Sequence, residues 1–302
     1  MNLKIFFSFL FILFAIFLLI FYWFVPFDTT EFKQTFQNSV NNSSFEGNSS
    51  QFYQNMRFPE SRISYIIDNC PLNKQNEMVE GFKFLEQKTI LRFYPVSSDE
   101  EIYVSCDSSN KIEGGLFIVG EGGPTKITNA GKFNVISNGK ILLIRDSSCP
   151  EPIVAIHELL HVLGFDHSNN PGSMMYPVSD CEQKIDQSSV DLINDIYSVP
   201  SYPDLIIENV TAIMHGKYLN TNLTIRNSGL RNSVSSNLDI YADNKLIKEF
   251  PVEPLEIGSG RVVYLTNVWV NKFSFDVLRF YVNYTSSELD KKNNEIKLEN
   301  KK

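Results

Sequence analysis

Basic residues are sparse and scattered in this 302-residue chain, which carries a net charge of −8. Binding to nucleic acid needs a concentrated patch of lysine and arginine, so this class of partner is not expected. The chain has only four cysteines, and no two of them have the C-x-x-C spacing of a cysteine-rich metal site. The glycine-rich stretch 120–124 lacks the Gly-Lys-Ser/Thr ending of a phosphate-binding loop, so we predict a turn there and assign it no chemistry.

Charge is absent from residues 5–25. As a helix, this run would extend about 31 Å, close to the thickness of the hydrocarbon core of a bilayer. Lys4 precedes the run, and the acidic Asp28 and Glu31 follow it. The positive-inside rule then places residues 1–4 in the cytoplasm and the remainder outside, which predicts a single-pass signal anchor in the cell membrane. A cleaved signal peptide, giving a secreted protein, is the alternative, but the run is long for one and ends in aromatic rather than small residues.

Histidine is also rare, yet three of the four histidines fall within one eleven-residue stretch. The stretch has the pattern H-E-x-x-H-x-x-G-x-x-H, formed by His157, Glu158, His161, Gly164 and His167. Residues four apart lie on one face of an α-helix, so His157 and His161 can bind one metal ion. Gly164 can adopt a positive φ and end the helix, which lets His167 return as a third ligand. A buried helix without a metal is the alternative, but it would bury two histidines and a glutamate at high cost.

Glu158 lies about 100° around the predicted helix from His157. It therefore cannot bind the metal together with both helical histidines, but it can reach the position that three histidines leave open to water. We expect zinc as the metal and Glu158 as the general base. The fourth histidine, His215, is isolated near a predicted turn, and we expect it to have only a surface role.

The histidine stretch is identified as the extended zinc-binding motif of the metzincin metalloproteases. Downstream, Ser173–Pro177 resembles their Met-turn, and Met175 follows His167 at the spacing found in the matrixin branch. Arg62–Asp68 resembles the first strand of a matrixin catalytic domain. Two further segments are similar to helices of this domain, a first helix at Leu72–Gln87 and a closing helix at Ser189–Tyr197. The pattern of residues between them predicts strands at 90–95, 102–105, 115–119 and 140–144.

The resemblance implies an α+β catalytic domain at residues 61–199, with a mixed twisted sheet and a zinc-binding active-site helix at 153–163. It further implies a protein or peptide substrate that lies extended along an exposed sheet edge. Glu158 would take a proton from water and pass it to the leaving amine. A calcium ion (Ca2+) is a further cofactor by family analogy, but no loop has convincing ligand spacing for it.

Three departures limit what the resemblance implies. There is no second histidine cluster for a structural zinc, so one catalytic ion (Zn2+) is expected. No cysteine precedes residue 61, so latency through a propeptide thiol is not expected. Ser179 stands where matrixins often carry a tyrosine in the wall of the specificity pocket, and the family's side-chain preference is therefore not carried over.

The even number of cysteines fits disulfides in an extracytoplasmic compartment, and three pairings are open. Cys149 precedes the predicted zinc helix and Cys181 follows the Met-turn. The pair Cys149–Cys181 would close a loop around the active site and is preferred, which leaves Cys70 and Cys106 as the second pair.

Two segments flank the predicted catalytic domain. Residues 26–60 are rich in Asn, Ser and Gln, and we predict a flexible stalk or, alternatively, a short propeptide. Residues 200–302 alternate apolar and polar side chains in short runs, as in an all-β, immunoglobulin-like sandwich. Its predicted strands are 205–214, 219–226, 238–243, 261–269 and 278–284. Pro203–Leu205, Arg226–Gly229 and Glu288–Glu295 resemble the CARDB family, immunoglobulin-like modules of prokaryotic cell-surface proteins.

Together these features predict a membrane-anchored, extracytoplasmic zinc endopeptidase whose C-terminal sandwich positions the protease or binds a surface partner. The alternative is an inactive surface adhesion or scaffold protein that acts through its sandwich. Inactive relatives usually lose a metal ligand or the base first, and here all three histidines and Glu158 are present. Zinc-dependent hydrolysis of a non-peptide substrate stays open, although the Met-turn favours a protease.

Overall fold

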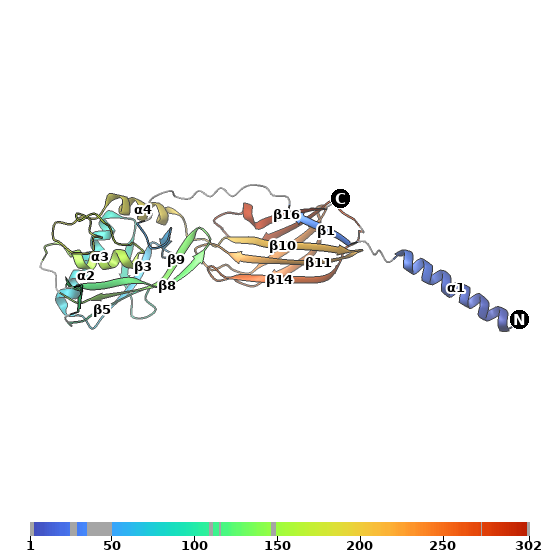
Figure 1. Ribbon diagram of the computed structural model, residues 1–302, viewed down its shortest axis with the longest axis horizontal. Helices are drawn as coiled ribbons and strands as arrows, with labels where there is room; N and C mark the ends of the chain where they lie inside the picture. Colours follow the sequence, from blue (N-terminus) through green and yellow to red (C-terminus); the bar gives the residue numbers. More distant parts are fainter. Residues whose placement is uncertain are drawn as a thin grey trace.

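The computed structural model describes residues 3–24, 29–34, 50–108, 111–114, 116–145, 149–272 and 274–300. Three bodies follow one another along its long axis: an α+β domain, a β-sandwich in the middle and the single helix α1 (Leu3–Phe24) at the far end (Figure 1). The order in space differs from the order in sequence, because the N-terminal helix lies beyond the sandwich that ends the chain.

Helix α1 stands apart from both domains (Figure 1). Nearly all of its side chains from Phe6 to Phe21 are exposed. Within the part of the chain that the structure describes, no helix is long and apolar enough to cross a membrane. The membrane span predicted at residues 5–25 therefore stays a prediction.

The α+β domain is built on a mixed sheet with the strand order β2-β9-β5-β3-β4, in which β8 pairs antiparallel with β9. The strands are β2 (Met56–Arg57), β3 (Arg62–Asp68), β4 (Arg92–Pro95), β5 (Ile102–Cys106), β8 (Gly120–Ala130) and β9 (Phe133–Leu143). Helices α2 (Leu72–Lys88) and α3 (Ile153–Val162) pack against each other, and α4 (Gln187–Ser198) ends the domain. The predicted mixed sheet and active-site helix are confirmed.

The largest departure from the predicted elements lies between β5 and β9. Residues 120–124 were predicted as a turn, but they begin the eleven-residue strand β8. A single strand predicted at 115–119 is instead a small hairpin of β6 (Ile112–Glu113) and β7 (Leu116–Phe117). Glycine disfavours strand formation, so the glycine-rich sequence predicted a turn at residues 120–124. The hydrogen bonds that β8 makes with β9 along its whole length outweigh this intrinsic preference.

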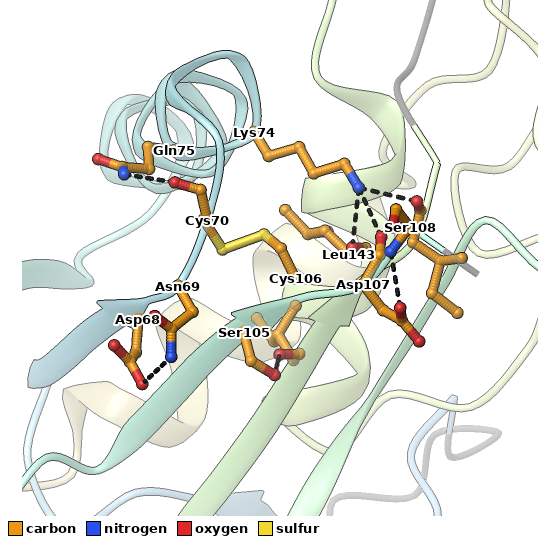
Figure 2. The surroundings of a disulfide bond; sticks show 12 residues. Asp68, Asn69, Cys70, Lys74, Gln75, Ser105, Cys106, Asp107, Ser108 and Leu143 are labelled. Carbon is orange, nitrogen blue, oxygen red and sulfur yellow. Dashed lines mark hydrogen bonds between the residues drawn. A yellow bond between two sulfur atoms is a disulfide. The ribbon is translucent and has the colours of Figure 1, made fainter.

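Two disulfides cross-link this domain. Cys70, which follows β3, is joined to Cys106 at the end of β5 (Figure 2). Cys149 precedes α3 and is joined to Cys181, which precedes α4. The preferred pairing Cys149–Cys181 is therefore confirmed.

Beside the first disulfide, a buried lysine ties α2 to the sheet. Lys74 is 5% exposed, and its Nζ donates to the carbonyl oxygens of Asp107 (2.8 Å), Leu143 (3.2 Å) and Ile144 (2.7 Å) (Figure 2). An ammonium group has three donors, and all three are used here. These three hydrogen bonds offset the cost of removing the charge of Lys74 from water, and they hold the ends of β5 and β9 against α2.

The second domain, for which the predicted name sandwich is kept below, is built on one eight-stranded antiparallel sheet in the order β13-β12-β15-β16-β1-β10-β11-β14, and both halves of this sheet contribute to one apolar core. Its elements are β10 (Leu205–His215), β11 (Tyr218–Asn227), β12 (Ser236–Ala242), β13 (Lys245–Val252), β14 (Gly260–Trp269), β15 (Val277–Asn283), η1 (Lys292–Asn294) and β16 (Glu295–Asn300). The predicted set lacked β13 and β16, whose exposed and charged residues hide their alternation.

The flexible stalk predicted at residues 26–60 needs correction. Residues Thr29–Gln34 form strand β1 within the sandwich sheet. Residues from 50 onward belong to the α+β domain, where Met56 and Phe58 are fully buried. Residues 35–49 lie outside the described part of the chain.

The two domains share a small apolar core. Ala130, Phe133 and Val135 of the β8–β9 hairpin pack against Leu230 of the sandwich. Close by, the buried guanidinium of Arg57 donates to the carbonyl oxygens of Pro59 (2.9 Å) and Val199 (3.0 Å), where the chain passes between the domains. The hairpin that contacts the sandwich therefore also supplies β8, which lies against the zinc-motif helix.

Candidate active site

Helix α3 carries two of the predicted metal ligands and is buried over its whole length. Its neighbours in the sequence are apolar, so His157, Glu158 and His161 are polar groups in an otherwise hydrophobic core, with exposures of 4–6%. Buried polar groups persist only when hydrogen bonds or a metal ion satisfy them. The partners of these three side chains therefore indicate what the site binds.

The structure brings the three predicted ligands together. His157 and His161 lie one turn apart on α3, and Gly164, with φ of +95°, ends the helical path so that His167 returns from a loop. The ligand nitrogens of the three histidines all lie within 4.8 Å of one another. A side chain at position 164 would also clash with Met56, because an added Cβ would lie 2.6 Å from the Cβ of Met56.

Hydrogen bonds fix the tautomers of the two helical histidines. Nδ1 of His157 lies 2.7 Å from the carbonyl oxygen of Met174, and Nδ1 of His161 lies 2.8 Å from that of Phe165. A carbonyl oxygen only accepts, so each Nδ1 carries the hydrogen and each Nε2 presents a lone pair. Burial lowers the pKa of both imidazoles, that of His161 to about 4, so both are neutral at pH 7.

The spacing of these lone pairs fits a metal ion. Nε2 of His161 lies 3.0 Å from Nε2 of His157 and 3.1 Å from Nε2 of His167. Two unprotonated nitrogens at that distance repel each other unless a cation lies between them. In tetrahedral zinc sites with Zn–N distances near 2.0–2.1 Å, ligand nitrogens are roughly 3.3 Å apart. The donor set therefore fits one zinc ion held by three imidazoles.

The segment identified as a Met-turn lies against this cluster. Met174 provides the carbonyl oxygen that orients His157, and Met175 is 3% exposed beside the site. The turn is held by Ser173, whose hydroxyl donates to Asp186 and accepts from the backbone N–H of Met175. Ser179 lies farther along this segment and is exposed.

Glu158 is buried beside the ligands. Burial is the main cause that raises the pKa of its carboxyl to about 8, and the negative charge of Glu121 adds to it. Strand β8 covers this residue at very short range. An added Cβ at Gly120 would lie 2.7 Å from Oε1 of Glu158, and one at Gly122 would lie 2.4 Å from its carbonyl oxygen.

Gly120 and Gly122 are therefore part of the site, although the sequence analysis gave stretch 120–124 no chemistry. Only glycine lets the backbone of β8 approach α3 this closely. Glycine at alternate positions of a strand is a known mark of close backbone approach, and this pattern was the available clue.

Residues 50–53, here called the N-terminal strap, were also missed as part of the site. The carbonyl oxygen of Ser50 accepts from the N–H of Asp166 (2.8 Å), and the N–H of Phe52 donates to the carbonyl oxygen of Gly164 (2.9 Å). The Phe52 ring stacks on His161 with 5.8 Å between ring centroids. The N-terminal strap thus holds the turn that leads from His161 to His167.

Comparison with known families agrees with this geometry. Residues 59–198 match the matrixin family, and residues 202–298 match the CARDB family. These matches confirm the resemblance drawn from the zinc motif, the Met-turn and the C-terminal turns.

Two curated proteins are similar to parts of the chain. Stromelysin-1 of Rattus norvegicus is 29% identical over 180 residues, which cover 53% of this chain and 37% of the relative. Zinc metalloproteinase nas-8 of Caenorhabditis elegans is 28% identical over 114 residues, which cover 37% of this chain and 24% of the relative. The chain therefore spans well under half the length of these relatives.

Proposed function

We propose that this chain is a membrane-anchored zinc endopeptidase that acts outside the cell, because residues 59–198 match the matrixin family and residues 202–298 match the CARDB family. The observation that carries the proposal is the convergence of the ligand nitrogens of His157, His161 and His167 beside the buried carboxyl of Glu158. The similarity to a protein named as a zinc metalloproteinase supports the same activity.

A zinc ion held by His157, His161 and His167 would supply Lewis-acid activation of water and of the scissile carbonyl. The positive charge of a bound zinc ion would favour the ionised form of Glu158 and so oppose the burial that raises the pKa of its carboxyl. In that form Glu158 accepts the proton that water gives up and then donates it to the amine nitrogen as the C–N bond breaks. Each turnover therefore returns the carboxylate to its starting state. The Nδ1 hydrogen bonds of His157 and His161 keep their rings oriented during this cycle.

The proposed substrate is an extended stretch of polypeptide that adds to the free edge of β8. Among the described residues, β8 pairs only with β9, so its other edge offers unpaired N–H and C=O groups. The start of this strand lies directly on Glu158 through Gly120 and Gly122. A peptide that pairs with this edge would thus pass beside the metal ligands, with backbone hydrogen bonds providing sequence-independent affinity.

The activity is tested with the full chain and an unfolded protein substrate. Cleavage is expected with zinc bound, and it should disappear when a chelator removes the metal and return when zinc is added back. Cleavage that continues after the metal has been shown to be gone would refute the proposal. A zinc-loaded chain that cleaves none of a broad panel of unfolded proteins would favour the inactive scaffold instead.

We further propose that residues 5–25 anchor the protein in the cell membrane as a single span. Support comes from the uncharged run, from the exposed apolar side chains of α1 between Phe6 and Phe21, and from the position of α1 away from both domains (Figure 1). The full chain should float with lipid vesicles, whereas a chain lacking residues 1–27 should not. Equal flotation of both chains, or removal of the segment in the mature protein, would contradict the anchor.

A further inference from the structure

Strand β1 comes from the N-terminal segment but lies inside the C-terminal sandwich. It pairs antiparallel with β10 on one side, where Phe32 faces Ala212, and with β16 on the other, where Phe32 faces Asn300 (Figure 1). Within the described part of the chain, β1 is the strand that links the two halves of the sandwich sheet, β10-β11-β14 and β16-β15-β12-β13.

One aromatic side chain anchors this strand. Phe32 is 6% exposed and stacks on the buried Phe275, with 4.9 Å between ring centroids and 18° between ring planes. The flanking Glu31 and Lys33 are exposed, so the strand alternates between the core and solvent. It therefore has both elements of strand recognition, namely backbone pairing along two edges and an apolar side chain buried in the core.

The sandwich has its own seven strands without β1. The CARDB match covers residues 202–298 and does not include the N-terminal segment. If β1 were withdrawn, β10 and β16 would each be left with an unpaired edge, which is an unfavourable state that proteins usually protect. The slot between β10 and β16 is thus suited to take an extended strand with an inward-facing aromatic residue.

We infer that the sandwich binds the chain's own N-terminal strand β1 as a receptor binds a peptide. Through β1, these non-covalent contacts hold α1 on the rest of the protein. The α+β domain begins near residue 50, at the opposite end of the sandwich from α1 (Figure 1). A cut between residues 34 and 50 would therefore sever the chain without releasing the two domains from α1. Attachment through β1 does not require protease activity.

The test uses the full-length chain in detergent, with an affinity tag at the N-terminus and a site for a sequence-specific protease inserted between Gln37 and Asn38. After complete cutting, the body of the protein should still elute with the tagged N-terminal fragment. In Phe32→Asp, a buried unpaired charge should shorten the half-time of release at least about tenfold. The matched control is Glu31→Gln in the same strand, whose side chain is exposed, and it should leave the half-time within about twofold.

Two further measurements test the same binding if Phe32→Asp does not fold. Phe32→Ala should give an intermediate half-time, and a synthetic peptide of residues 27–36 in excess should speed release from the wild-type chain by occupying the vacated slot. Release of the wild-type body as soon as the chain is cut would overturn the inference. So would equal half-times for the wild type and a folded Phe32→Asp variant.

Discussion

Replacing Glu158 with glutamine is expected to lower the rate of peptide hydrolysis by about 10²–10⁴-fold while zinc stays bound. Glutamine has nearly the same size and keeps one carbonyl oxygen, so the tight contact with Gly120 is preserved. It cannot take a proton from water or carry one to the leaving amine. The three imidazole ligands do not depend on Glu158 for their hydrogen bonds, since Met174 and Phe165 orient the helical pair.

The measurement is the ratio kcat/KM for a cleaved peptide, taken together with the zinc content of the same preparation. Glu151→Gln is the matched control, because Glu151 is an exposed carboxylate just before α3 and should leave both values unchanged. A Glu158→Gln enzyme of full activity would eliminate Glu158 as the general base. Loss of both activity and zinc would mean instead that Glu158 supports the metal site.

The metal ligands could be predicted from the sequence because their arrangement is local. The spacing of His157 and His161 fixes a shared helix face, and Gly164 fixes where the chain turns toward His167. The preferred disulfide at Cys149 and Cys181 followed from the same local order, since both cysteines flank these motifs.

The features that were missed depend on pairing between distant segments. Gly120 and Gly122 resemble a turn until a helix is known to lie against them, and that helix comes more than thirty residues later in the sequence. Strand β1 has a single buried aromatic residue, Phe32, and its partner Ala212 lies 180 residues away. Strand formation depends on such neighbours more than on intrinsic preference, so a polar segment of this kind looks like a stalk from sequence alone.

The N-terminal strap at the site could not be predicted from the sequence either. Two of its contacts are backbone hydrogen bonds between Ser50–Phe52 and Gly164–Asp166, and such bonds leave no side-chain pattern in the sequence. The side-chain amide of Gln51 also donates to the carbonyl oxygen of Leu163, but a single glutamine does not identify such a contact in advance. Only the aromatic pair Phe52 and Tyr53 stands out from the polar residues before it. The strap nevertheless fixes the turn that sets the position of His167 relative to the two helical ligands.

Replacing His161 with alanine is expected to abolish zinc binding and, with it, all hydrolysis. His161 is the central ligand, because its Nε2 lies within 3.1 Å of both other ligand nitrogens. Loss of a residue that merely orients a ligand costs about 10–100-fold in metal affinity, and loss of the ligand itself should cost more. Alanine also removes the ring on which Phe52 stacks and the hydrogen bond to Phe165, so the turn before His167 loses two supports.

Zinc content per chain and thermal unfolding, each measured with and without a chelator, separate metal loss from general damage. A ligand that binds only the folded state raises its stability by mass action, so the wild-type α+β domain should unfold at a lower temperature once the metal is removed. His161→Ala should already unfold at that lower temperature and should not respond to the chelator. His215→Ala is the matched control, since His215 is exposed at the end of β10, and it should behave as the wild type. If His161→Ala still bound one zinc per chain, the three-histidine site would be wrong, and Glu158, the nearest buried carboxylate on the same helix, would have to be reassigned from base to ligand.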